Sequence, residues 1–122
     1  MKVIEKRWGQ EIYLNDHAPY QVKRLIVNPG KSTSLHYHNK KHETLIVVEG
    51  ELRIEWMDES VTVHPEGNVV PISPGEEYAH RMFNEGDIPV KYIECSTPDF
   101  DAEDNVRVRW EPGHVDDQSD QS

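Results

Sequence analysis

The sequence predicts an all-β protein, and three observations lead to this prediction. The 122 residues include 13 Val and 8 Ile but only 3 Ala and 5 Leu. Branched side chains lose rotamer freedom in helices and pack well on pleated sheets. Eight Pro and seven Gly are spread along the chain and separate many short apolar segments. About ten short strands at such spacing are typical of a β-sandwich or an antiparallel β-barrel.

The expected strands follow the apolar segments in order. Leu52, Ile54 and Trp56 alternate with charged residues, which is the period-2 pattern of a half-buried strand. A single helical turn is expected at residues 76–79. The pattern as a whole predicts strands at residues 11–14, 20–28, 33–38, 42–48, 51–57, 61–63, 69–72, 79–83, 90–95 and 106–110. These elements form one domain over residues 1–115, and the acidic segment 116–122 has no apolar residue, so we expect it to be a disordered tail.

Length and charge exclude several classes of protein. The chain has 23 acidic residues against 13 Lys and Arg, a net charge of −10, which argues against nucleic-acid or anionic-membrane partners. No segment approaches the ~20 apolar residues of a membrane helix. The first residues do not resemble a secretory signal, and the single Cys95 allows no internal disulfide. We therefore expect a cytoplasmic protein that binds a small molecule.

Four side chains form a candidate metal site. His36 and His38 are two residues apart on a predicted strand, so both imidazoles project from one face. The polar turn at residues 39–41 lets the returning strand bring Glu43 beside them, and His80 on a later strand can close the site. This nitrogen and oxygen set suits one divalent transition metal: Zn, Mn, Fe, Ni or Co. The alternative interpretation is an exposed His-x-His pair without a metal.

The glycines around this group resemble the first cupin motif. Gly30, five residues, His36-x-His38, four residues, Glu43, six residues and Gly50 match that motif at every fixed position. The resemblance implies a single cupin domain, which is an antiparallel β-barrel or jelly roll, with the four side chains as ligands.

A second set of residues resembles the second cupin motif less closely. Gly67, Gly75, His80 and Asn84 follow it, but Ser73 replaces the expected Pro. Four residues instead of two separate Gly75 from His80, so the loop before His80 contains a small insertion.

Most of residues 6–109 resemble a narrower family, the cupin domain of type II mannose-6-phosphate isomerases. The likeness rests on Lys6-Arg7-Trp8-Gly9, Val22-Lys23-Arg24, Asn84-x-Gly86-x-x-Pro89, Ile93-Glu94 and Glu103-Asp104-Asn105-Val106-Arg107. Two positions differ, because His36 stands where the family commonly has Gln, and Glu111-Pro112-Gly113-His114 stands where the family closes with an Arg-containing sequence. The resemblance implies a metal-dependent isomerase or epimerase acting on a sugar or sugar phosphate.

Further residues are candidates for substrate contacts. Arg24 shares strand parity with Val22 and Ile26, so we expect it to point inward beside apolar residues and to bind an anion; Arg107 is a second such candidate. Lys23, on the opposite parity, is expected to face solvent. Tyr92 and Glu94 share one face of a strand, where Tyr92 could line the pocket and Glu94 could act as the base, or the two could form a hydrogen-bonded core pair.

Three functions remain open at this stage. They are a mannose-6-phosphate isomerase-like isomerase or epimerase, a metal-dependent dioxygenase or lyase on a small organic acid, and a non-enzymatic small-molecule-binding cupin. The fold alone does not choose among them. A small β domain must also cover its sheet edges, so we expect a homodimer with residues 6–14 at the interface.

Overall fold

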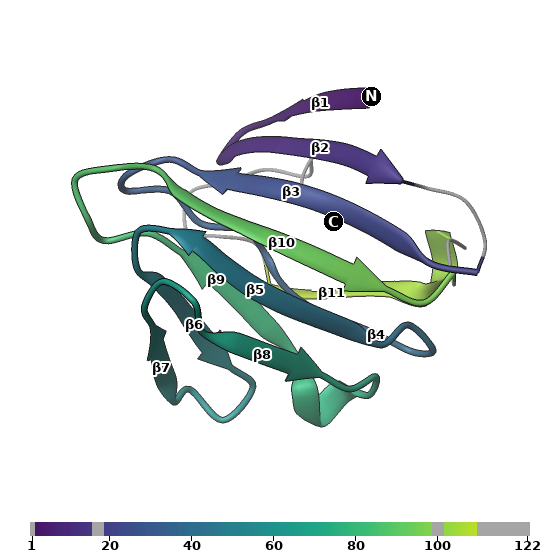
Figure 1. Cartoon of the computed structure of the whole chain (residues 1–122). Coiled ribbons are helices and arrows are strands. Elements are labelled where there is room, and N and C mark those ends of the chain that lie inside the picture. Colours follow the sequence, from purple (N-terminus) through teal and green to yellow (C-terminus); the bar gives the residue numbers. More distant parts are fainter. Residues whose placement is uncertain (1, 16–18, 99–101, 110–122) are drawn as a thin grey trace.

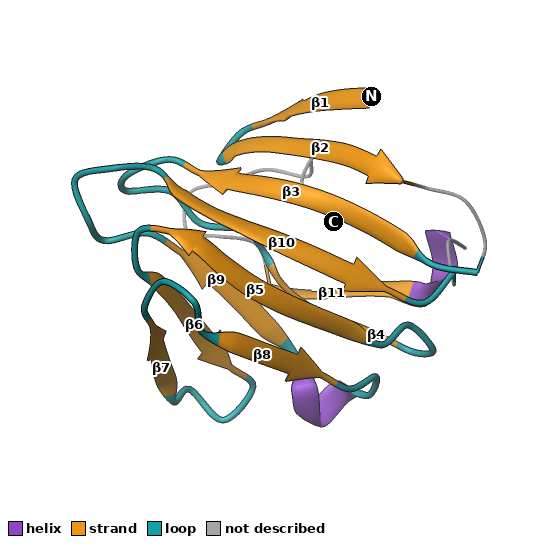
Figure 2. Ribbon diagram, in the orientation of Figure 1, coloured by secondary structure: helices purple, strands orange, loops and turns teal. Residues whose placement is uncertain are grey.

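The computed structural model describes residues 2–15, 19–98 and 102–109. The strands are β1 (Lys2–Lys6), β2 (Gly9–Asn15), β3 (Gln21–Val27), β4 (Leu35–His38), β5 (Glu43–Glu49), β6 (Leu52–Trp56), β7 (Val61–His64), β8 (Val69–Ile72), β9 (His80–Phe83), β10 (Val90–Ser96) and β11 (Asn105–Arg109). Two short 3-10 turns, η1 (Glu76–Tyr78) and η2 (Ala102–Asp104), precede β9 and β11 (Figure 2).

The strands form two antiparallel sheets that pack face to face (Figure 1). The six-stranded sheet has the order β1-β2-β3-β10-β5-β8, and the five-stranded sheet has the order β11-β4-β9-β6-β7. The all-β prediction is therefore confirmed. The predicted segment 11–14 is part of the longer β2, and β1 was not predicted, because its short sequence lies at the sheet edge with little burial. The predicted tail at 116–122 lies outside the described residues.

The inner face of the six-stranded sheet changes from apolar to polar along the strands. At one end, Val27 of β3 pairs with Val90 of β10, and both side chains are buried. At the other end, Ser96 of β10 pairs with Gln21 of β3 and with Glu43 of β5, all three buried. The apolar core therefore fills one end of the barrel, and buried polar side chains gather at the other.

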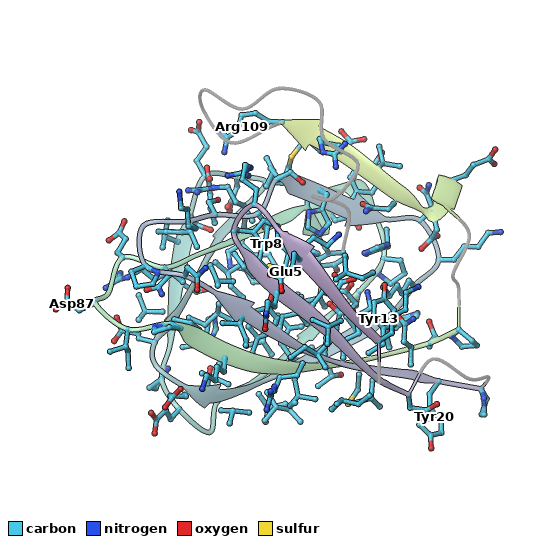
Figure 3. All side chains as sticks on the ribbon, turned by 90° about the horizontal axis from the view of Figure 1, so that it is seen from above. Glu5, Trp8, Tyr13, Tyr20, Asp87 and Arg109 are labelled. Carbon is cyan, nitrogen blue, oxygen red and sulfur yellow. The ribbon has the colours of Figure 1, made fainter. Side chains whose placement is uncertain are left out.

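The connection between β1 and β2 fixes the N-terminal hairpin to this core. Trp8 is completely buried and belongs to the core cluster (Figure 3). A Cβ atom on Gly9 would lie 1.7 Å from the backbone oxygen of Ile26, so only glycine allows β2 to approach β3 this closely. Trp8 and Gly9 thus pack the N-terminal hairpin onto the barrel.

No helix in the described part of the chain is both long and apolar enough to cross a membrane.

Candidate functional site

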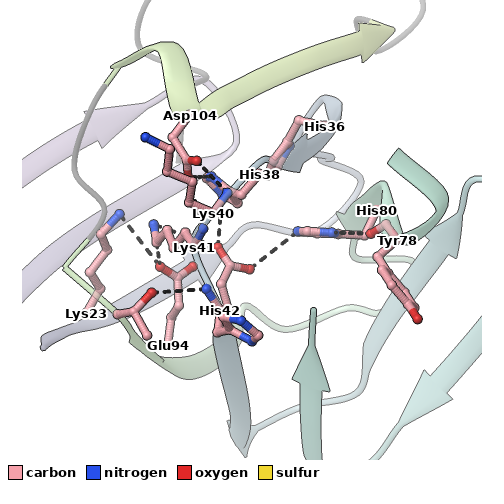
Figure 4. Close-up of polar contacts among 12 residues, drawn as sticks. Lys23, His36, His38, Lys40, Lys41, His42, Tyr78, His80, Glu94 and Asp104 are labelled. Atoms are coloured by element: carbon pink, nitrogen blue, oxygen red, sulfur yellow. Dashed lines mark hydrogen bonds and ion pairs between the residues drawn. The ribbon is translucent and has the colours of Figure 1, made fainter. Parts of the chain in front are cut away.

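The four predicted ligands lie together inside the polar end of the barrel. His36 and His38 come from β4, Glu43 begins β5 and His80 begins β9 (Figure 4). His36 and His80 are direct partners across the β4–β9 pair, so their side chains project from the same face. All four side chains are buried, and none is more than 5% exposed.

The Glu43 carboxylate lies between two of the imidazoles. Its Oε1 is 3.0 Å from His38 Nε2, and its Oε2 is 3.5 Å from His80 Nε2. The His36 ring packs edge to face against both other rings, with centroid distances of 4.8 Å to His80 and 5.9 Å to His38. His38 Nε2, His80 Nε2 and Glu43 Oε2 are buried, and no contact of theirs has hydrogen-bond geometry.

The opposite nitrogen of each imidazole lies close to an acceptor. His36 Nδ1 lies 2.9 Å from the Ser34 carbonyl oxygen, and His80 Nδ1 lies 2.9 Å from that of Tyr78. His38 Nδ1 lies 3.3 Å from the Asp104 carboxylate. Such outer contacts hold the rings so that their Nε2 sides face the interior.

Burial and the neighbouring charges shift the pKa values of these side chains in different directions. Burial alone would raise the pKa of Glu43, but His38, His80 and the Lys41 ammonium hold it well below its usual range. Burial alone would lower the pKa of His80, but the Glu43 carboxylate raises it. Burial, together with the neighbouring His80 and His38, lowers the pKa of His36 well below its usual range.

A second buried cluster adjoins the first. Lys41 Nζ lies 3.7 Å from Glu43 Oε1 and 3.5 Å from Glu94 Oε2. Lys23 Nζ lies 3.7 Å from Glu94 Oε2 and 3.6 Å from Glu11 Oε1. The two clusters therefore form one continuous chain of charges, which Figure 4 shows from His80 to Lys23.

This chain of charges is not neutral. The buried charged side chains among the described residues are two lysines, Lys23 and Lys41, and four carboxylates, Glu11, Glu43, Glu94 and Asp104. With neutral histidines, the summed formal charge of these six side chains is −2. Charge buried without compensation is costly, so the polar end of the barrel fits a bound divalent cation. However, within the described ranges, no three His, Cys, Asp or Glu side chains are already arranged as metal ligands.

The orientations predicted for Lys23 and Arg24 were wrong. Arg24 is exposed on the outer face, whereas Lys23 is 3% exposed and points into the barrel, where the Glu94 and Glu11 carboxylates outweigh burial and raise its pKa. The error arises because both faces of β3 carry apolar residues: Val22 and Ile26 point outward, and Leu25 and Val27 point inward. The alternation of apolar residues therefore did not distinguish the two faces.

The other predicted contact residues lie on the inner side. Tyr92 and Glu94 are completely buried on the inner face of β10, and burial raises the pKa of Tyr92 well above its usual range. Arg107 is half-buried and is the direct partner of His36 across the β11–β4 pair, so it projects from the same face as that imidazole.

Three residues of the charge chain were missed by the sequence analysis. Lys41 appears in the sequence as part of a polar turn, and Asp104 lies 64 residues from the Lys40 amide to which it is hydrogen bonded. Glu11 lies on β2, and its charge gave no reason to place it inside. Only Lys41 had a local signal, since it stands two residues before Glu43, on the same face if the strand continues.

The fold and site define a cupin, and solved structures match it. A double-stranded β-helix protein from Klebsiella pneumoniae matches with a TM-score of 0.71 and 20% identity, covering 81% of this chain and 80% of that one. A sugar phosphate isomerase of the cupin superfamily from Silicibacter pomeroyi matches with a TM-score of 0.67 and 22% identity, covering 82% and 75%. At these identities the matches establish the fold.

The chain belongs to the mannose-6-phosphate isomerase C-terminal family, whose model matches residues 2–111. A mannose-1-phosphate guanylyltransferase of Escherichia coli O157:H7 is 30% identical over 104 residues, which are 84% of this chain and 21% of that protein. The xanthan biosynthesis protein XanB of Xanthomonas campestris is 32% identical over 108 residues, 88% of this chain and 22% of that protein. The chain thus spans about a fifth of these curated relatives.

Neighbouring substitutions on β3 test the burial of the charge chain. We expect Lys23→Met to lower the free energy of unfolding by about 3 kcal/mol, because it removes the ion pair of the buried Glu11 and leaves Glu94 with Lys41 alone. Arg24→Met is the matched control, and its effect should stay within about 0.5 kcal/mol because the side chain is exposed. Urea unfolding in the presence of a chelator measures the free energy of unfolding of both variants. Equal effects would contradict the assignment of the two faces.

Proposed function

We propose that the protein is a metal-dependent isomerase of a sugar phosphate, with mannose 6-phosphate and fructose 6-phosphate as the expected pair. The observation that carries this proposal is the buried cluster of formal charge −2 around three imidazoles. Membership of the mannose-6-phosphate isomerase C-terminal family supports the choice of substrate class.

We propose His36, His38, Glu43 and His80 as the metal ligands. A carbonyl oxygen only accepts hydrogen bonds, so the contacts of His36 and His80 to Ser34 and Tyr78 place the proton on Nδ1 and leave the Nε2 lone pair facing inward. The donor set of three imidazoles and one carboxylate fits a divalent transition metal. The metal, when bound, supplies a Lewis acid that polarises a carbonyl or hydroxyl oxygen.

Glu94 is the proposed base. Isomerisation of an aldose to a ketose removes the proton from C2 and returns a proton to C1, while a proton moves from O2 to O1. A buried carboxylate on the inner face of β10 can take the carbon-bound proton and give it back. The Lys41 ammonium, 3.5 Å from Glu94, favours negative charge nearby, as in an enediolate.

Arg107 is the proposed contact for the phosphate. It lies beside His36 on the inner side of an edge strand, so it combines a fixed positive charge with partial exposure. Guanidinium groups bind phosphate with two parallel hydrogen bonds. Lys23 and Lys41 are almost completely buried, which makes them less accessible to a phosphate than the half-buried Arg107.

A second candidate function follows from the third histidine. With His36 in place of the family's common Gln, the donor set also suits iron and oxygen chemistry on a small organic acid. A binding module without turnover remains the third hypothesis. Metal identity and oxygen consumption distinguish these functions from isomerisation.

Homodimerisation and a cytoplasmic location also remain proposals. Residues 6–14, the predicted interface, lie mainly on β2, which is flanked by β1 and β3 within the chain. Since β2 is not an edge strand, we propose that edge pairing in this N-terminal region uses β1 (Lys2–Lys6), which is one edge of the six-stranded sheet.

Metal retention should depend on the proposed ligands. We expect His38→Ala and Glu43→Gln to lose stoichiometric metal after dialysis, because each removes one of four ligands. His42→Ala is the matched control, since His42 is exposed next to Glu43. Elemental analysis of the purified variants measures the metal content. Full retention in either ligand variant, or loss in the control, would contradict the assignment.

The kinetic constants kcat and KM should distinguish the role of Glu94 as the base from that of Arg107 as the phosphate contact. The metal-loaded protein should interconvert the two hexose 6-phosphates. Glu94→Gln should lower kcat about 100-fold or more with the metal retained. Arg107→Ala should raise KM about tenfold and lower kcat less, because the phosphate is remote from the reacting carbons. A coupled assay measures both constants. The absence of turnover with Zn, Mn, Co and Ni would reject isomerisation, and oxygen consumption with Fe would favour the oxygenase.

Sedimentation tests the dimer. We expect a homodimer that dissociates when a proline replaces Ile4 in the β1 edge strand, since proline removes a backbone donor and disfavours edge pairing. A wild-type chain that sediments as a monomer at high concentration would refute the proposal.

A further inference from the structure

The insertion before His80 presents side chains that the proposed reaction does not use. Its residues form η1 (Glu76–Tyr78). The Tyr78 carbonyl contacts His80 Nδ1, whereas the Tyr78 ring is 42% exposed and points away from the cluster (Figure 4). The insertion therefore presents an aromatic side chain beside the candidate metal site.

An open pocket of about 600 Å³ lies against this ring. It is formed by η1, by the end of β6, by the start of β7 and by the turn between these two strands. Its lining residues are Trp56, Met57, Asp58, Ser60, Thr62, Glu77 and Tyr78. Pockets of this size that combine aromatic walls with a few polar groups are typical of small-molecule sites.

Trp56 connects the pocket to the candidate metal site. It is the direct partner of His80 across the β6–β9 pair, and the two ring centroids are 6.2 Å apart. The indole is also held in place, because its Nε1 donates a hydrogen bond of 2.8 Å to Thr62 Oγ1. One aromatic wall of the pocket is therefore a fixed surface next to His80.

The polar groups of the pocket are anionic or neutral. Asp58 and Glu77 contribute carboxylates, and hydrogen bonds from Ser60 lower the pKa of Asp58. No cationic side chain is among the described residues that line it. A phosphate is therefore repelled here, whereas sugar hydroxyls find both acceptors and donors.

We propose that this pocket is a subsite for a neutral pyranose ring, with the C–H face of the sugar on Trp56 and Tyr78 and its hydroxyls toward Asp58 and Glu77. Aromatic rings offer a large, rigid apolar surface to such a face. The inference deepens the proposed function, and the orientation of the substrate rests on that function. In this orientation the phosphate lies away from the pocket, on the Arg107 side of His80.

The Trp56 indole N–H gives a direct readout of binding. In nitrogen-15 NMR spectra of the metal-stripped protein, we expect methyl α-D-mannopyranoside to shift this resonance, which Trp56→Phe identifies. Inorganic phosphate should leave it in place. Tyr78→Ala should weaken sugar binding at least tenfold, and the exposed Tyr20 provides the matched control, since Tyr20→Ala should not change it.

A charge reversal supplies an independent test. Glu77 is exposed, so Glu77→Lys should fold normally and should make inorganic phosphate shift the Trp56 resonance. The inference is overturned if the sugar causes no shift, if phosphate shifts the wild-type resonance as strongly, or if Tyr78→Ala binds the sugar unchanged. The titration involves no turnover. Sugar binding with no isomerase activity would therefore keep the subsite and reject the proposed reaction.

Discussion

The chain of buried charges is the constraint on which the site depends. It runs from Glu11 through Lys23, Glu94 and Lys41 to Glu43, and the distances between neighbours lie between 3.5 and 3.7 Å. Removing any one charge takes an opposite charge away from its neighbours in a medium that solvates them poorly. The apolar core at the other end of the barrel packs strands β3, β5 and β10, which also carry these charges, and so holds them at fixed separations. The same strands therefore carry the apolar core at one end and the buried charges at the other.

The parts of this arrangement that are local in sequence could be predicted. A two-residue spacing on a strand places His36 and His38 on one face whatever the rest of the chain does. A short turn brings Glu43 back beside them, and the glycines at both ends fix the length of the hairpin. The abundance of Val and Ile likewise predicts sheets without knowledge of their order. His80 was predictable only through the spacing to Asn84, which the insertion leaves intact.

The remaining parts depend on contacts between distant segments. β3 carries apolar residues on both faces, so its sequence does not reveal that Lys23 and not Arg24 points inward. That choice follows from the neighbouring strands of the same sheet, where Glu94 of β10 is the direct partner of Lys23. Asp104 reaches His38 from the far end of the chain, and the pairing of Arg107 with His36 depends on how β11 joins the sheet. No local pattern contains this information.

The outer contacts of the three imidazoles differ in how they respond to mutation. His36 and His80 take their orientation from backbone carbonyls of residues 34 and 78, and every amino acid provides such a carbonyl. The side chains at these two positions can therefore vary during evolution without changing which nitrogen faces the interior. His38 instead relies on the carboxylate of Asp104. A single codon change at position 104 can remove the outer contact of one proposed ligand while those of the other two stay as they are, which makes this position the natural point for tuning the site.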